Sequence, residues 1–279
     1  HQARSPEGGA GRISIALSAD WTEPLHPHSP SDIAAAERRQ AFQWGWFADP
    51  IWRGGRYPAT MVERVGGRLP VFTPEQAASL NGSVDFIAVN HYTSRYAYEP
   101  HPCPNEVGGP SPSGLGWLED QCVTDSTTDA AGVPIGLEAG SDWLYVVPWG
   151  FKKLLVWISE SYGGQGTDIY VTENGVDCPS ESELTLPAVL NDTFRIAYHN
   201  QYWAAMADAV SGHGVNVRGY FVWSLIDNFE WADGFSKLFG MVYVDRDEPG
   251  SLTRHGKRSF TEWFRETALG LANGVHGRG

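Results

Sequence analysis

The sequence predicts an α/β fold in which helices cover a parallel sheet. Three observations support this: four segments have the composition of β-strands, a helical segment follows each of them, and polar side chains stand at the strand ends. Alternating strand and helix segments are typical of a parallel sheet with helices outside it, because parallel strands need a crossover connection. We identify four such units and no internal repeat.

The first unit begins with a strand over residues 13–21, where apolar and small polar residues alternate. Ser31 and Asp32 then offer an N-cap for a helix over 33–47, which is rich in Ala, Glu and Arg and has apolar residues at helical intervals. Further along, Thr73 followed by a proline predicts the start of another helix, after a loop with one short helix.

The second unit has a strand over 83–94 and a helix over 148–162. Residues 97–140 between them are rich in Pro, Gly and Ser, and a loop this long in a compact domain is usually functional. The helix places Phe151, Leu154, Leu155 and Ile158 on one stripe, which predicts a core-facing side.

The third unit has a strand over 168–175 and a helix that Asp192 caps and that runs to Ala209. In the fourth, the apolar run 218–226 predicts a strand buried on both faces, and 259–271 predicts a final helix ending at Asn273-Gly274.

Two strand ends carry the chemistry. Glu173 ends the third strand, and carboxylates at the carboxyl ends of parallel strands are typical of enzyme sites, although a solvated acid could also simply begin a loop. After the fourth strand come Asn228, Glu230 and Trp231, with Trp223 inside the run. Indole faces stack on sugar rings while Glu and Asn bond hydroxyls, so this end suggests a carbohydrate pocket, with core packing as the alternative for the tryptophans.

The segments VTENG and WSLIDNFEW resemble the nucleophile and sugar-binding segments of family 1 glycoside hydrolases, the retaining β-glucosidase group. DFIAVNHYTS, SDWLYVVPWGF and FGMVYVD also match, in the family's order. The resemblance implies a (β/α)8 TIM-barrel type in which this chain holds only about the last four βα units, the fifth to eighth strands. Residues 1–279 would then form a single partial domain, the C-terminal half of the barrel.

The resemblance also implies roles for individual residues. Glu173 matches the family's nucleophile, Tyr92 matches the tyrosine that donates a hydrogen bond to it, and Asn90 lies beside that tyrosine. A tyrosine whose hydroxyl only finds a backbone partner is the alternative for Tyr92. The expected substrate-binding residues are Asn90, Trp223 as a stacking platform, Glu230 and Trp231 on the outer hydroxyls, and Trp143 and Phe239 near the leaving group, where core packing is an equal alternative.

The family's acid/base glutamate lies in an Asn-Glu-Pro-like segment that this chain does not contain. Asn105-Glu106 and Glu23-Pro24 look similar, but they stand in the long loop and after the first strand. We therefore expect hydrolysis of terminal β-linked sugars from a small β-glycoside, with the N-terminal half of the barrel as partner, and a weakly active or inactive isolated chain. A non-catalytic sugar-binding module on the same fold is the alternative.

Composition excludes several other functions. The net charge is −13, with 33 acidic and 20 basic residues, so nucleic acid and anionic membranes are not expected partners. We expect no metal and no cofactor, because no His or Cys set has ligand spacing, and no apolar segment is long enough to span a bilayer. Cys103, Cys122 and Cys178 are expected as free structural thiols, with a Cys103–Cys122 disulfide as the alternative. The sequence gives no cellular location.

Overall fold

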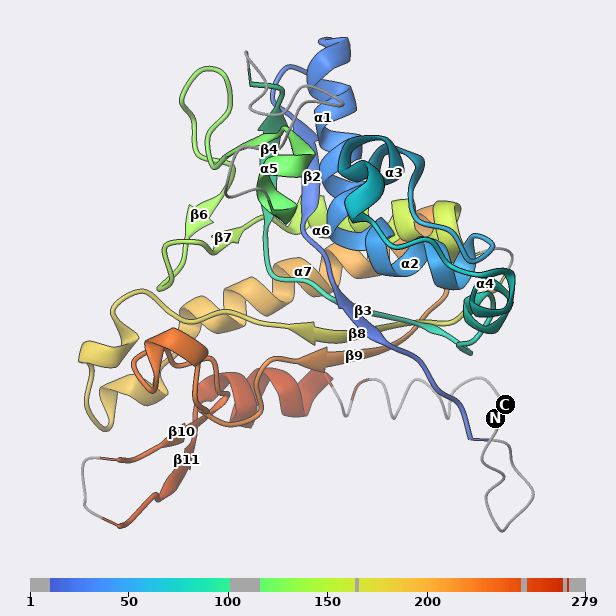
Figure 1. Cartoon of the computed structure of the whole chain (residues 1–279). Coiled ribbons are helices and arrows are strands. Elements are labelled where there is room, and N and C mark those ends of the chain that lie inside the picture. Colours follow the sequence, from blue (N-terminus) through green and yellow to red (C-terminus); the bar gives the residue numbers. More distant parts are fainter. Residues whose placement is uncertain (1–10, 101–115, 164–165, 247–249, 268–269, 271–279) are drawn as a thin grey trace.

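The computed structural model describes residues 11–100, 116–163, 166–246, 250–267 and 270. Its centre is a four-stranded sheet in the order β1 (Ala16–Ser18), β3 (Ile87–Asn90), β8 (Ile169–Asn174) and β9 (Val217–Val222). All neighbouring pairs are parallel, and the strand order follows the chain order (Figure 1). The predicted parallel α/β arrangement of four units is confirmed.

Helices cover one face of this sheet. They are α1 (Pro30–Gln40), the π-helical turn η1 (Ala41–Gly45), α2 (Trp46–Trp52), α6 (Pro148–Ile158) with its π-helical extension η3 (Ser159–Gly163), and α7 (Thr193–His213). The main core lies between them and the sheet, where Ile87, Val89, Ile169 and Val171 are buried together with helix residues such as Phe151. These strand residues alternate along the chain, so one face of the sheet supplies the core.

The other face of the sheet is less covered, and one prediction fails there. Tyr220 on β9 packs against the core, but its neighbour Phe221 points the other way and is 56% exposed. The expectation that 218–226 is buried on both faces is wrong, because among the described residues no layer covers that face at Phe221. The strand is also shorter than predicted and ends at Val222.

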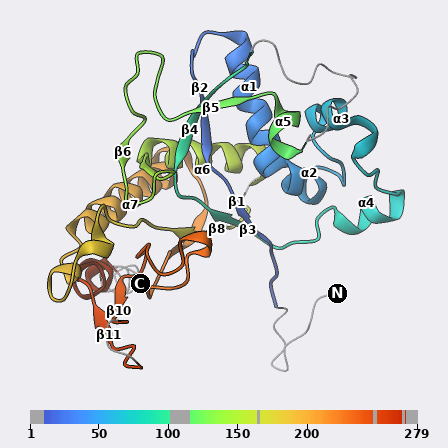
Figure 2. The same ribbon diagram turned by 60° about the vertical axis from the view of Figure 1, so that its left-hand side comes forward.

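A second sheet extends beyond the carboxyl ends of β1 and β3. It contains β2 (Trp21–Pro24), β4 (Ser94–Tyr98) and β5 (Thr124–Ser126), and α1 packs beside it (Figure 2). The predicted strands 13–21 and 83–94 therefore each divide into two pieces. The short pairs β6 (Leu137–Glu138) with β7 (Tyr145–Val146), and β10 (Val242–Val244) with β11 (Arg254–Gly256), complete the strands.

The helix ends show where local signals were sufficient. Thr73 forms the predicted capping arrangement for α4 (Pro74–Leu80). The cap of α1, however, is Ser29, because Pro30 fits the first helical turn and moves the start upstream of Ser31. Asp192 stands at the start of α7 without a side-chain capping bond, and its carboxylate instead accepts from Ser259 and Arg195.

The remaining elements are short. They are α3 (Ala59–Val65), η2 (Gly66–Arg68), α5 (Trp117–Gln121), η4 (Glu181–Glu183), η5 (Ala188–Leu190), η6 (Trp231–Asp233) and η7 (Ser259–Phe264). The long loop thus contains α5, β5 and β6, while Asn105-Glu106 and the predicted end of the last helix at 273–274 lie outside the described residues.

The cysteines differ from the expectation of free thiols. Cys122 is disulfide-bonded, so that expectation is wrong for it, and Cys103 lies outside the described residues. Cys178 is free, and burial raises the pKa of its thiol to about 12.

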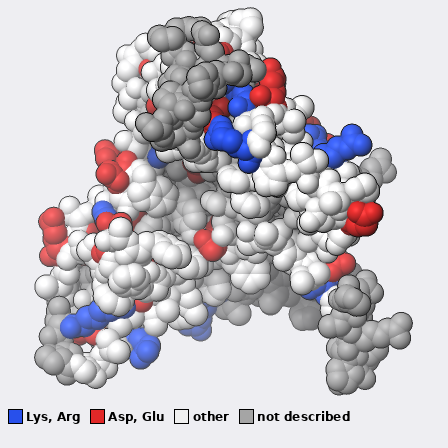
Figure 3. Space-filling model, in the orientation of Figure 1, with Lys and Arg blue, Asp and Glu red and all other residues white. Residues whose placement is uncertain are grey.

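Within the described ranges, no helix is both long enough and apolar enough to cross a membrane. On the face drawn in Figure 3, the charged side chains of the described residues form small separate groups of both signs, with uncharged surface between them.

Candidate active site

The candidate residues gather at one edge of the central sheet because the carboxyl ends of parallel strands meet there. Asn90 ends β3 and pairs in register with Glu173 on β8, and Asn174 pairs with Val222 at the end of β9. Trp223 follows directly, and its backbone N–H donates to the carbonyl oxygen of Asn174 (2.9 Å). Three consecutive strands therefore bring their ends to one place.

A β-bulge at Thr172 determines where Glu173 points. Val171 and Glu173 pair with consecutive residues of β3, so Thr172 is an extra residue in β8. Strict alternation would place Glu173 on the same face as Ile169 and Val171, which are fully buried against the helices. The extra residue leaves Glu173 half-buried, and Asn174 takes the fully buried position instead.

Tyr92 holds the Glu173 carboxylate. Its hydroxyl donates to Glu173 Oε2 over 2.6 Å, a length typical of a hydrogen bond to a charged oxygen. Burial, together with this bond, raises the pKa of Tyr92 far above its ordinary value, so it stays a donor. The Tyr92 ring meets Trp143 and Phe239 edge to face, with centroids 5.9 and 6.2 Å apart. Phe239 is buried, whereas Trp143 is 41% exposed.

Asn90 is held next to the same carboxylate. Thr172 Oγ1 donates to Asn90 Oδ1 over 2.6 Å. Because Asn90 pairs in register with Glu173, its amide lies at the same strand edge as the carboxylate.

Trp223 and Glu230 form the second half of the site. The indole Nε1 donates to Glu230 Oε1 over 3.1 Å. Burial raises the pKa of Glu230, and the negative charges of Asp177 and Glu173 act in the same direction. Gly175 allows the backbone of Trp223 to approach the nucleophile segment this closely, because a Cβ at position 175 would lie 1.5 Å from the carbonyl oxygen of Trp223.

Trp231 is placed differently from the other candidates. It begins η6 with a backbone φ of 49° and is 83% exposed. The structure therefore brings together Glu173, Tyr92, Asn90, Trp143 and Phe239, and joins Trp223 to Glu230, while Trp231 extends into solvent.

Sequence reasoning missed a buried hydrogen-bond network around Asn174. Its Nδ2 donates to the carbonyl of His91 (2.7 Å) and to the hydroxyl of Tyr198 (2.9 Å), and its Oδ1 accepts from Tyr220 (2.6 Å). His199 Nδ1 lies 3.1 Å from the Tyr220 hydroxyl. The only signal in the sequence was that Asn174 follows Glu173, since the tyrosines read as ordinary core residues.

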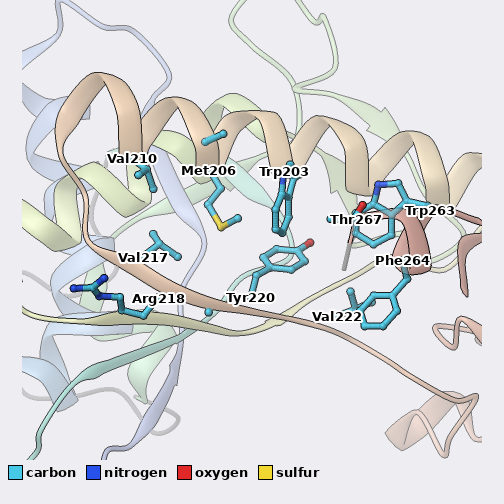
Figure 4. A pocket seen from close by; sticks show the side chains of 12 residues that line it. Trp203, Met206, Val210, Val217, Arg218, Tyr220, Val222, Trp263, Phe264 and Thr267 are labelled. Atoms are coloured by element: carbon cyan, nitrogen blue, oxygen red, sulfur yellow. The ribbon is translucent and has the colours of Figure 1, made fainter. Parts of the chain in front are cut away.

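An apolar cavity of about 530 Å³ lies elsewhere, between α7, β9 and η7 (Figure 4). Trp203, Met206, Tyr220 and Trp263 are among its lining residues, and none of the candidate residues is. The cavity is therefore separate from the Glu173 edge. Across the described residues, no group of three or more His, Cys, Asp or Glu side chains is placed to hold a metal ion.

The profile described as Glycosyl hydrolase family 1 matches residues 2–270. The chain belongs to glycosyl hydrolase family 1. β-Glucosidase 6 of rice (Oryza sativa subsp. japonica) is 41% identical over 259 residues, covering 91% of this chain and 46% of the rice protein. Raucaffricine-O-β-D-glucosidase of Rauvolfia serpentina is 39% identical and covers 96% of this chain and 46% of its own length. The chain thus spans about half the length of these relatives.

Solved structures of the family agree. β-Glucosidase 2 of the fungus Trichoderma reesei, in complex with Tris, has a TM-score of 0.83 and 43% identity, covering 95% of this chain and 54% of that one. A rice β-glucosidase mutant in covalent complex with glucose has a TM-score of 0.81 and 40% identity, covering 91% and 50%. Family 1 β-glucosidases have a (β/α)8 TIM barrel, and the present four βα units match about half of it, as expected.

Proposed function

We propose that this family 1 chain supplies the nucleophile and the sugar-binding part of a retaining β-glucosidase site. The observation that carries the proposal is the 2.6 Å hydrogen bond from Tyr92 to Glu173, at the strand edge where Trp223 and Glu230 are also joined. Residues 1–279 would be one partial domain of the barrel, and terminal β-linked glucose would be the sugar released.

Glu173 is proposed to attack the anomeric carbon. Tyr92 occupies Oε2, and Oε1 receives no hydrogen bond from the described residues, so it is the oxygen free to form the new bond. The covalent glycosyl–enzyme ester would then be hydrolysed by water, which gives retention of configuration. The covalent glucose complex of the rice relative supports this order of steps for the family.

The sugar would lie between the two halves of the site. The indole of Trp223 offers a stacking face, the Glu230 carboxylate accepts from hydroxyls, and the Asn90 amide donates to a hydroxyl near Glu173. Trp231 is proposed as a further contact to the outer hydroxyls. Trp143 and Phe239, which flank Tyr92, would border the leaving group.

Retention needs a second carboxyl group about 5–5.5 Å from the nucleophile, to protonate the departing oxygen. Two other acids lie near Glu230 and the nucleophile segment: Glu230 itself accepts from Trp223, and Asp177 is buried and accepts from Ser141 through Oδ2. We propose that the acid/base glutamate comes from an N-terminal half of the barrel. General acid catalysis contributes typically about 10²–10⁴-fold, so the chain alone should hydrolyse unactivated glycosides very slowly.

A mechanism-based label tests the nucleophile without needing the acid. In 2,4-dinitrophenyl 2-deoxy-2-fluoro-β-D-glucoside, the C1–O bond breaks as Glu173 bonds to C1, and the phenolate leaves with the electron pair and needs no proton. Mass spectrometry should find one added fluorodeoxyglucosyl group, mapped to the peptide with Glu173. Glu173→Gln is the control and should stay unlabelled.

Two results would contradict the proposal. Labelling at another residue, or equal labelling of the Glu173→Gln variant, would remove Glu173 as the nucleophile. Calorimetric binding of glucosides without any labelling would instead favour a non-catalytic sugar-binding module.

A further inference from the structure

Arg195 lies at the centre of a buried cluster that the proposed chemistry does not use. It belongs to the first turn of α7 and is fully buried. Its Nε donates to the carbonyl of Val176 (3.1 Å), and its terminal nitrogens donate to Asp192 (2.6 Å), Glu181 (2.6 and 3.1 Å) and the carbonyl of Leu238 (2.5 Å). Guanidinium has five N–H donors in a fixed plane, and five contacts are made.

The two carbonyl contacts join the two halves of the candidate site. Val176 follows Glu173 by three residues, and Leu238 immediately precedes Phe239, which packs on Tyr92. These carbonyls belong to different loops, one after β8 and one after β9. A single side chain therefore donates hydrogen bonds to both the nucleophile segment and the loop that carries Glu230.

Lys257 extends the cluster to the base of that loop. Its buried ammonium lies 2.7 Å from Glu181 Oε1 and 3.4 Å from Asp227 Oδ1. Asp227 in turn accepts from the backbone N–H groups of Gly240 (2.8 Å) and Val244 (3.3 Å). The loop from 227 to 240 is thus closed at both ends by groups that connect, through Glu181, to Arg195.

The cost of burying the charged groups around Arg195 indicates that this cluster has a geometric role. Removing charges from water into a protein interior costs free energy that their mutual attraction often fails to offset, and apolar replacements of buried ion pairs are often neutral or stabilising. Arg195 and Lys257 together keep the pKa of Glu181 lowered despite its burial, so the carboxylate remains ionised. What the ionic cluster provides beyond stability is a fixed direction for each bond.

We propose that Arg195 is a positioning residue for glycosyl transfer: it fixes the Glu173 segment relative to the loop that carries Glu230. This inference rests on the proposed function. Because a small misplacement of reacting groups costs up to about 100-fold in rate, loss of Arg195 should slow labelling of Glu173 by between about 10- and 100-fold.

Two variants separate positioning from folding. Arg195→Lys keeps the charge but offers fewer donors. Arg195→Met combined with Glu181→Met removes a cation and an anion together, so the net charge of the cluster is unchanged. Lys257 then keeps Asp227 as a partner, and the buried Asp192 carboxylate keeps its two hydrogen bonds from Ser259. The matched control is Arg218→Met, since Arg218 is an exposed arginine that pairs with Asp168.

Each variant is first checked by urea unfolding and then studied by two readouts. The first is the labelling rate with the fluorinated dinitrophenyl glucoside, as a function of its concentration. The second is amide hydrogen exchange at Ser224 and Gly240, which donate to Phe239 and Asp227, compared with the sheet amides of Ile87 and Ile169. We expect slower labelling and faster exchange at the loop amides only, with Arg195→Lys intermediate and Arg218→Met unchanged.

The outcomes are distinct. Wild-type labelling rates and unchanged loop exchange in the folded double variant would overturn the inference, as would global unfolding of both Arg195 variants, which would make the role purely structural. If the unmutated chain is never labelled at Glu173, the proposed function fails, while the exchange data still decide whether Arg195 holds the two segments together.

Discussion

Replacing Tyr92 with phenylalanine removes one hydroxyl from the candidate site and keeps the ring. The ring contacts with Trp143 and Phe239 should therefore survive, while the 2.6 Å bond to Glu173 is lost. A hydrogen bond to a charged group contributes about 1.5–3 kcal/mol. If the bond mainly holds the carboxylate in its attacking orientation, its loss slows formation of the glycosyl–enzyme by about 10- to 150-fold.

The assay is the rate at which the fluorinated dinitrophenyl glucoside labels the protein, followed by dinitrophenolate release and mass. Tyr57→Phe is the matched control, because Tyr57 stacks on Phe72 and is not among the candidate residues. Thermal unfolding of both variants should stay close to that of the parent. A Tyr92→Phe protein that is folded and labels at the parental rate would refute the idea that this hydroxyl orients Glu173.

Three further predictions follow from the same geometry. Glu230→Gln should weaken the binding of 1-deoxynojirimycin, measured by calorimetry, by about 10- to 100-fold, while the fluorinated glucoside should still label Glu173. If the variant and the parent bind 1-deoxynojirimycin with equal affinity, Glu230 does not contribute to sugar binding. Burial lowers the pKa of His91 to about 4 and that of His199 to about 3. As the pH falls from about 6.5 towards 4, these two histidines therefore bind protons in the unfolded state but not in the folded state. The free energy of unfolding should then drop by roughly 1–3 kcal/mol per pH unit. A urea midpoint that is equal at pH 7 and pH 5 would contradict this. Gly175→Ala should destabilise the fold in urea, whereas Gly67→Ala, with open space around it, should not.

Local sequence signals predicted the units of the fold well. The run of Ile169, Tyr170, Val171 and Thr172 predicts a strand because β-branched and aromatic residues fit a pleated, half-buried surface, which is a property of the residues themselves. The apolar stripe at helical spacing predicted α6, and Thr73 followed by a proline predicted the start of α4. Local signals did not give the division of the first two strands between two sheets, since that depends on which distant strand is the partner.

Part of the candidate site was also visible in the sequence. Glu173 and Glu230 were identifiable by residue type and by their place after apolar runs, and Trp223 as an indole inside such a run. Their roles remain proposals, and the exposed position of Trp231 could not be predicted, because it depends on a turn with positive φ within the loop. The disulfide at Cys122 was likewise not fixed by cysteine spacing.

The sequence by itself determined the order of βα units and the chemical groups available at their ends, because periodicity and residue type are local properties. Tertiary structure alone decided the face to which Glu173 turns, through the extra residue Thr172 in its pairing with β3. It also decided the partners of Arg195, which lie up to 43 residues away along the chain. Both depend on contacts between distant segments, and no local pattern encodes the direction in which such segments meet.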